Sequence, residues 1–112
     1  MKTSSAKAKG RRLQDYIVKI LYENYSHLRP GDIRPAIMGE QGRDVKLSPV
    51  AEDYIPFDIE AKNQEKLNIW GSLKQAEENS SDDRIPLLVF KRNRSKTYAV
   101  IEFEKLMELI LE

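Results

Sequence analysis

Two acidic residues and a lysine in this sequence have the types and spacing of a metal-dependent site that cleaves phosphodiesters. Glu60 and Lys62 belong to the stretch 57–62, in which apolar and charged residues alternate as they do in a β-strand. Side chains two positions apart on a strand share a face, which places these two about 6.6 Å apart along it. Asp44 falls in the preceding candidate strand, 43–47. Two carboxylates beside an ammonium group are the minimum set for a divalent metal with a neighbouring lysine, so the pattern predicts metal-dependent attack on a phosphodiester.

The same spacing also fits an ordinary solvent-exposed strand face. In the stretch 57–62 the apolar Phe57, Ile59 and Ala61 are expected to face the core, which leaves the acidic and basic residues on the opposite face. The chain is 33% charged, and 44–46 is a second acid-x-Lys triplet. Charged residues are common on exposed strand faces. The spacing alone therefore leaves both interpretations open, and the surrounding elements have to position the site.

Length and composition limit the class of protein. The 112 residues fit one domain, and 40% hydrophobic residues supply a modest core. The chain has no cysteine and a single histidine, His27, which excludes disulfides and the usual ligand sets of catalytic zinc. Any metal is expected to be bound by oxygen. No stretch has the length of a membrane span or the apolar segment of a signal peptide, so we expect a cytoplasmic protein without a membrane partner.

Basic residues gather at two places, although the formal net charge is only +1. One group precedes the first acidic residue, Asp15, and the other lies within 91–96. Such patches can bind nucleic-acid phosphates, but a solvated N-terminus and a solvated turn are commonly basic as well. The residues that we expect to contact DNA are Lys9, Arg11, Arg12, Lys91, Arg92 and Arg94.

Hydrophobic periodicity and turn signals predict one α/β domain in residues 9–112, preceded by a basic flexible tail in 1–8. Trp70, Tyr54 and Tyr98 fit either a core position or stacking on unpaired bases. The expected elements are helices at 10–24, 64–79 and 103–111, strands at 33–38, 43–47, 57–62, 87–90 and 97–101, and a connector with room for one helical turn at 49–56.

Short motifs follow one another along these elements in a characteristic order: Lys9-Gly10, Gly42-Arg43-Asp44, Leu47-Ser48-Pro49, Pro56 to Lys62, Lys74-Gln75-Ala76 and Leu88 to Lys91. This order resembles the PD-(D/E)xK nuclease superfamily, especially small Holliday-junction-resolvase-like endonucleases of the archaeal and phage-encoded kind. The resemblance spans roughly residues 9 to 92 and implies a restriction-endonuclease-like α/β fold, in which a central mixed sheet is flanked by helices.

The resemblance also implies roles for individual residues. Asp44 and Glu60 would ligate Mg²⁺, which Mn²⁺ can replace, and the backbone carbonyl of Ala61 would be a further ligand. Lys62 would position or activate the attacking water. The chemistry agrees, because two carboxylates leave positions on an octahedral Mg²⁺ for a phosphate oxygen and a water.

Three further residues have roles that the resemblance leaves less certain. Gln75 falls where similar nucleases have a glutamine behind the site, but it also fits an exposed helix position. Gln14 stands where archaeal-type resolvases commonly have a glutamate, so the site has one negative charge fewer and a second metal would bind poorly. Asp58 shares the face of Glu60 and is either an accessory carboxylate or an exposed acid at the start of a strand.

The sequence therefore predicts a metal-dependent DNA endonuclease that acts on branched DNA such as four-way junctions. Resolvases of this resemblance act as homodimers, and the last helix would supply the interface or close the core. A noncatalytic nucleic-acid-binding module with the same fold is the alternative. A domain that only binds other proteins is a third interpretation.

Overall fold

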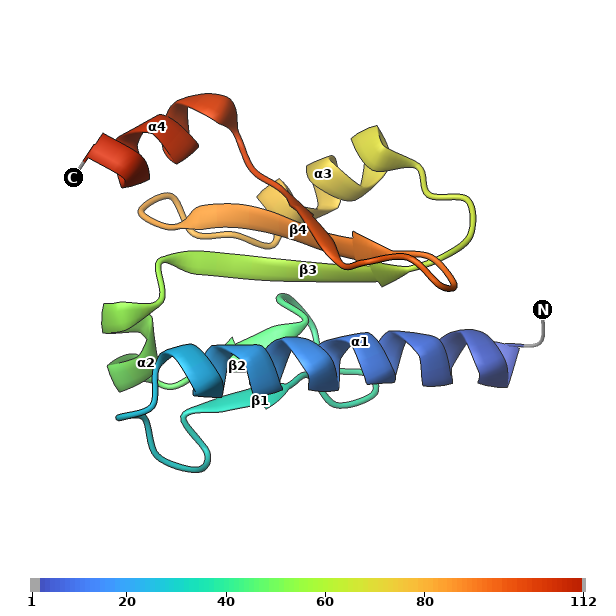
Figure 1. Ribbon diagram of the computed structural model, residues 1–112, viewed down its shortest axis with the longest axis horizontal. Coiled ribbons are helices and arrows are strands. Elements are labelled where there is room, and N and C mark those ends of the chain that lie inside the picture. The colour runs from blue at the N-terminus through green and yellow to red at the C-terminus, as the bar shows by residue number, and fades with distance from the viewer. Residues whose placement is uncertain (1–2, 112) are drawn as a thin grey trace.

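Strand β3, Phe57–Asn63, lies at the centre of the fold in this computed structural model, which describes residues 3–111 (Figure 1). It pairs in parallel with β4, Ile85–Lys91, and Glu60 lies opposite Leu88 in the register. On the far side of β4, the short strand β5, Tyr98–Val100, runs antiparallel. The result is a mixed three-stranded sheet in the order β3-β4-β5.

A hairpin extends this arrangement on the other edge of β3. Strands β1, Ile33–Pro35, and β2, Val45–Leu47, form an antiparallel pair. The backbone N–H of Asp44, just before β2, donates to the carbonyl of Ile59 at 3.0 Å. This hydrogen bond joins the hairpin to the middle of β3. Asp44 therefore lies next to the part of β3 that contains Glu60.

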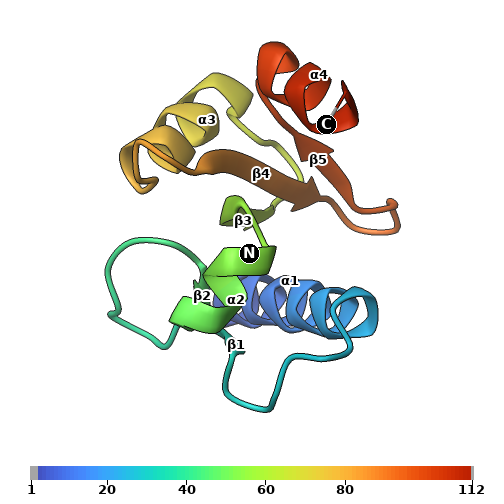
Figure 2. The ribbon, with the colours of Figure 1, turned by 90° about the vertical axis from the view of Figure 1, so that its left-hand side faces the viewer.

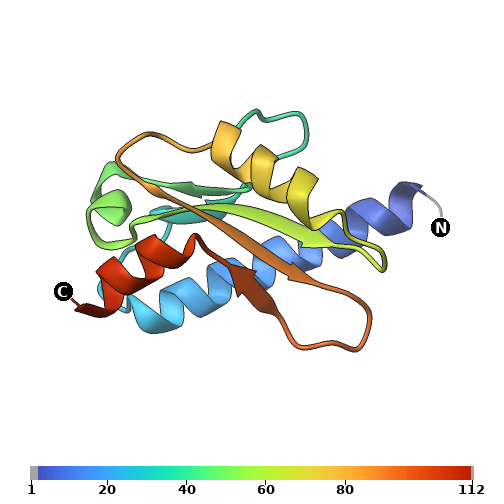
Figure 3. The same cartoon turned by 90° about the horizontal axis from the view of Figure 1, so that it is seen from above.

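Helices cover the sheet on both sides. Helix α1, Thr3–Asn24, packs along one side against β1, β2 and β3. Helix α3, Ile69–Glu78, packs on β3 and β4 from the other side, and α4, Phe103–Leu111, lies on that side too (Figures 2 and 3). The main core fills the space between α1 and the strands, and its buried members include Leu13, Ile17, Ile33, Val45, Ala51, Ile55, Ile59 and Val89.

Both long helices differ from the predicted ranges. Helix α1 begins at Thr3 instead of near Gly10, so the described part of the expected tail is helical. Ala6, Lys7 and Ala8 are strong helix formers, which explains the early start. Helix α3 begins only at Ile69 because the side chain of Asn68 accepts the N–H of Gly71 at 2.9 Å and caps the helix there.

Turns also shorten the first predicted strand and make a helix of the connector. The strand ends at Pro35, and a turn closes where the N–H of Glu40 donates to the carbonyl of Ile37. Gly39 takes the positive φ of 84° in this turn, which a glycine adopts without strain. The connector forms α2, Pro49–Tyr54, whose first turn is capped by the Ser48 hydroxyl.

The charged face of β3 is not a solvated face. Asp58 and Glu60 are each 2% exposed, because α3 packs over the side of the strand that the alternation pattern assigned to solvent. Strands that are covered on both sides usually carry apolar residues throughout. Two buried acidic residues in such a strand need partners, and those partners define the candidate site.

The structure is thus a single α/β domain with a mixed sheet between helices. In residues 3–111, no helix has the length and apolar character needed to cross a membrane.

Candidate active site

Asp44 is fixed to the neighbouring strand by its side chain as well as by its backbone. Its Oδ2 accepts the backbone N–H of Ala61 at 2.7 Å. Within residues 3–111 no strand pairs with this edge of β3, so the carboxylate accepts an N–H that a carbonyl of a neighbouring strand would otherwise accept. The carboxylate of Asp44 is therefore held beside Glu60, which precedes Ala61 on β3.

Glu60 is the buried acid of the site. The Nδ2 of Asn79 donates to its Oε1 at 3.3 Å, and the Nζ of Lys62 lies 3.7 Å from its Oε2. Burial is the main cause that raises the pKa of Glu60 to about 7, and the nearby Asp44 carboxylate raises it further. The hydrogen bond from Asn79 and the charge of Lys62 act in the opposite direction.

A groove of about 450 Å³ gives access to Asp44 from the surface. It lies between the first part of α1 and the turn after β1. Arg11 and Gln14 line it from α1, and Ile37 and Met38 line it from the turn. Gln14 and Asp44 therefore line one groove. An amide at this position adds no negative charge.

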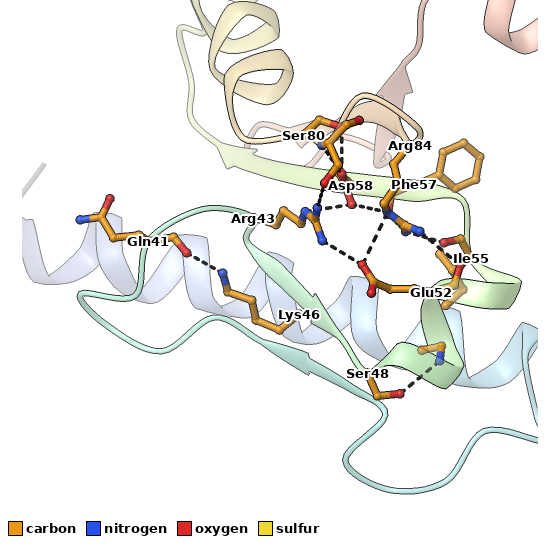
Figure 4. A network of polar contacts seen from close by, with 12 residues as sticks. Gln41, Arg43, Lys46, Ser48, Glu52, Ile55, Phe57, Asp58, Ser80 and Arg84 are labelled. Atoms are coloured by element: carbon orange, nitrogen blue, oxygen red, sulfur yellow. Dashed lines mark hydrogen bonds and ion pairs between the residues drawn. The ribbon is translucent and has the colours of Figure 1, made fainter.

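Asp58 takes part in a different, buried network (Figure 4). Its Oδ1 accepts the Nε of Arg84 at 2.7 Å, and its Oδ2 accepts the hydroxyl of Ser80 at 2.8 Å and the N–H of Ser81 at 3.1 Å. The guanidinium of Arg84 also donates to the carbonyl of Phe57 at 2.9 Å. These donors saturate the carboxylate, so its role in the structure is to hold the start of β3 to the segment before β4.

Arg43 connects this network to the candidate site. Its Nε lies 3.0 Å from Oδ1 of Asp58, and its Nη1 donates to Oε2 of Glu52 on α2 at 3.0 Å. Gly42, with a φ of 89°, precedes it and lets the chain turn sharply there. Because Arg43 is anchored on one side, the next residue, Asp44, is held with its carboxylate toward β3.

Asn79 contacts the buried acid of the site, and the order of motifs did not predict this contact. Gln75 and Asn79 both belong to the end of α3, but the side chain of Gln75 is exposed, whereas Asn79 at the C-cap reaches Glu60. Asn79 follows the last residue of α3, where the chain leaves the helix and its side chain meets Glu60. A polar residue at the end of a helix was the available signal in the sequence.

The predicted DNA-contact residues separate into distinct environments. Lys9 is 6% exposed and its Nζ lies 3.4 Å from Oε2 of Glu65. Arg11 lines the groove at Asp44, and Arg92 is exposed. Residues from both ends of the chain meet in another groove, of about 550 Å³, which is lined by Lys9, Arg12, Lys91 and Arg94 among others.

The donor set of the site suits a hard divalent cation. Asp44 and Glu60 supply two carboxylates whose mutual repulsion a cation would relieve, and Ala61, which directly follows Glu60, supplies a backbone carbonyl. Within residues 3–111, no group of three or more acidic, histidine or cysteine residues gathers around one point. Two carboxylates and one carbonyl would leave the other positions of an octahedral Mg²⁺ or Mn²⁺ to waters.

Comparison of this chain with protein families, with curated proteins and with solved structures gave no match. The assignment of function therefore depends on the geometry of the site and on the order of its motifs.

Proposed function

We propose that this protein is a metal-dependent DNA endonuclease that hydrolyses phosphodiester bonds in branched DNA, in the manner of a Holliday-junction resolvase. The observation that carries the proposal is the pair of adjacent carboxylates, Asp44 and Glu60, with Lys62 beside them. A buried acid next to a like charge costs stability, and such costs are typical of sites that bind a cation or perform chemistry. The order of motifs along the chain supports the same class of nuclease.

Each residue of the site has a role in this proposal. Asp44, Glu60 and the carbonyl of Ala61 would hold Mg²⁺ or Mn²⁺, which would supply charge to polarise the phosphate and to lower the pKa of a water. Lys62 carries a positive charge that offsets the charge developing on the phosphoryl oxygens. Asn79 holds Glu60 in place and favours its ionised form. Gln14, on the groove, orients a water or a phosphate oxygen by hydrogen bonding.

A homodimer is the expected form, because a four-way junction has two equivalent strands to cut. Helix α4 supports this, since Phe103, Ile110 and Leu111 leave large apolar side chains exposed on a helix that buries none of its residues. Trp70 on α3 is 82% exposed and adds to this apolar surface. Sedimentation of the wild-type protein should give a mass twice that of one chain. The double variant Ile110→Glu and Leu111→Glu should sediment as a monomer.

A noncatalytic DNA-binding module is the second candidate. The neutral Gln14, in the groove where a third carboxylate would strengthen metal binding, favours it. This module would bind DNA equally well with and without a divalent metal.

Cleavage of end-labelled DNA separates the two candidates. A four-way junction and a matching linear duplex are incubated with Mg²⁺, Mn²⁺ or EDTA. We expect symmetric cuts in the junction that disappear with EDTA and in Glu60→Gln and Lys62→Ala. Asp53→Asn and Lys74→Ala are the matched controls, because both residues are exposed and lie outside the site. Tight binding of DNA without any cut under either metal would overturn the nuclease proposal.

A further inference from the structure

A third groove, of about 620 Å³, lies between α1 and the hairpin formed by β4 and β5. We name it the hairpin groove and define it by Arg12, Tyr16, Asn63, Lys91 and Lys96, which come from α1, the end of β3 and the β4–β5 hairpin. The groove of Lys9 described above adjoins it and shares three of these residues. The basic residues near the two ends of the chain are therefore brought together only by folding.

The hairpin groove has an excess of positive charge. Within the described residues, Arg12, Lys91 and Lys96 form no ion pair, unlike Lys9. Glu65, which lines the adjoining groove, is already occupied by Lys9 and by the backbone N–H of Asn93 at 2.6 Å. These three unpaired cations come from different elements and line one groove. Such an arrangement favours a ligand that carries several negative charges along its length.

The groove also contains an exposed aromatic ring. Tyr16 is 47% exposed and follows Arg12 by one helical turn, so the ring and the guanidinium share a face of α1. In proteins that bind single-stranded nucleic acid, exposed aromatic rings stack on the bases while neighbouring cations bind the phosphates of the nucleic-acid backbone. A duplex keeps its bases stacked inside and offers only phosphates, whereas an unpaired strand offers both. The combination therefore favours a single strand.

Asn63 supplies the part of the groove that comes from β3. It is the last residue of that strand, and its Nδ2 donates to the carbonyl of Lys9 on α1 at 3.0 Å. Its side chain therefore lies on the α1 face of the strand, opposite to the face of Lys62. Its Oδ1 is the only buried side-chain polar atom without a hydrogen-bond partner in the described part of the chain. An unpaired acceptor at the floor of a groove is a cost that a donor on a ligand or a bridging water would remove.

We propose that the hairpin groove binds an unpaired nucleic-acid strand, with phosphates on Arg12, Lys91 and Lys96 and a base stacked on Tyr16. The role of this strand as part of the substrate rests on the proposed function, and it deepens that function. Branched DNA in which one arm is unpaired would be preferred over a fully paired duplex, because the unpaired arm offers both a base to Tyr16 and phosphates to the cations of the hairpin groove.

Binding in EDTA tests the groove without reference to cleavage. A short fluorescein-labelled oligothymidylate and a labelled duplex of the same length are titrated with the full chain, and anisotropy is recorded at several salt concentrations. We expect tighter binding of the single strand, and a loss of roughly tenfold or more in Tyr16→Ala, with near wild-type binding in Tyr16→Phe. Arg12→Ala and Lys96→Ala should each weaken binding and lower the slope of log affinity against log salt by roughly 0.7.

Lys74→Ala, an exposed lysine on α3, is the control for a general loss of charge and should bind like the wild type. Circular dichroism shows whether each variant is folded. Equal affinity for duplex and single strand, or unchanged binding in folded Tyr16→Ala, would overturn the proposal. Competition by polyglutamate as strong as that by the oligonucleotide would also overturn it, since it would mean that only charge is recognised. Metal-dependent cleavage is recorded separately, so a protein that binds the strand but never cuts refutes the nuclease assignment alone.

Discussion

The carboxylate of Asp44 and the backbone N–H of Ala61 form a 2.7 Å hydrogen bond that joins the hairpin to β3. This one bond has both a structural and an electrostatic effect, since it closes the edge of the strand and holds the charge of Asp44 next to Glu60. Asp44→Ala should lower the free energy of unfolding by roughly 1–3 kcal/mol, because a half-buried N–H loses its acceptor. Urea denaturation measures this loss.

Asp44→Asn separates the two effects. The amide oxygen can still accept the N–H of Ala61, so most of the stability should remain, but the negative charge is gone. Binding of Mg²⁺ by isothermal titration calorimetry should then weaken strongly. If Asp44→Asn bound Mg²⁺ as tightly as the wild type, Asp44 would not be a metal ligand.

Glu60 should make the metal-free protein less stable as pH rises. Its pKa is raised from 4.5 to about 7 in the folded state, chiefly by burial, so the folded protein holds this proton more tightly than the unfolded chain does. Its contribution is fully present below pH 4.5 and is lost as pH increases to about 7. The shift corresponds to roughly 3 kcal/mol.

Glu60→Gln should remove this dependence, since glutamine does not titrate. At pH 8 in EDTA the variant should therefore be more stable than the wild type, whereas addition of Mg²⁺ should raise the melting temperature of the wild type only. Thermal melts at pH 4.5, 6 and 8 test both statements. A wild-type protein whose stability in EDTA did not fall over this pH range relative to Glu60→Gln would contradict the predicted burial of the charge.

Asn79 should tune the ionisation of Glu60, and Gln75 should not. Loss of the hydrogen bond in Asn79→Ala should raise the pKa of Glu60 further, because the donor favours the ionised carboxylate. Affinity for Mg²⁺ requires that ionised form, so its rise with pH should move to higher pH. Calorimetric titrations across pH measure the displacement. Gln75→Ala is the matched control, and a displacement of equal size in that variant would reject the assignment of Asn79.

The Asp58–Arg84 pair should be the most sensitive polar contact for stability. Asp58→Ala leaves the guanidinium of Arg84, whose side chain is only 10% exposed, with the more distant carboxylate of Glu52 at 3.8 Å in place of Asp58 at 2.7 Å. Removal of one partner of a buried pair typically costs roughly 3–5 kcal/mol. Equilibrium unfolding in urea tests this, with Asp53→Ala as the exposed control. A cost below 1 kcal/mol would mean that the network of Figure 4 contributes little to the fold.

The order of elements could be read from local patterns, but their ends could not. The alternation in 57–62 and the turn before Arg43 located two strands correctly, because backbone preference and side-chain period are properties of neighbouring residues. The ends of α1 and β1 depended on weaker signals, such as the alanines before Lys9 and a turn at Gly39, and the predicted ranges differ there from the structure.

The sequence by itself determined which chemical groups the site contains: two carboxylates, a lysine and a neutral Gln14, with no cysteine and one histidine in the chain. Only the tertiary structure decided the environment of each group, because burial depends on which distant element packs over a strand. Helix α3 packs over the charged face of β3 and buries it. In this buried environment Asp58 accepts a hydrogen bond from Arg84, and Glu60 accepts one from Asn79. Folding also brought the first helix against the β4–β5 hairpin and so created the hairpin groove.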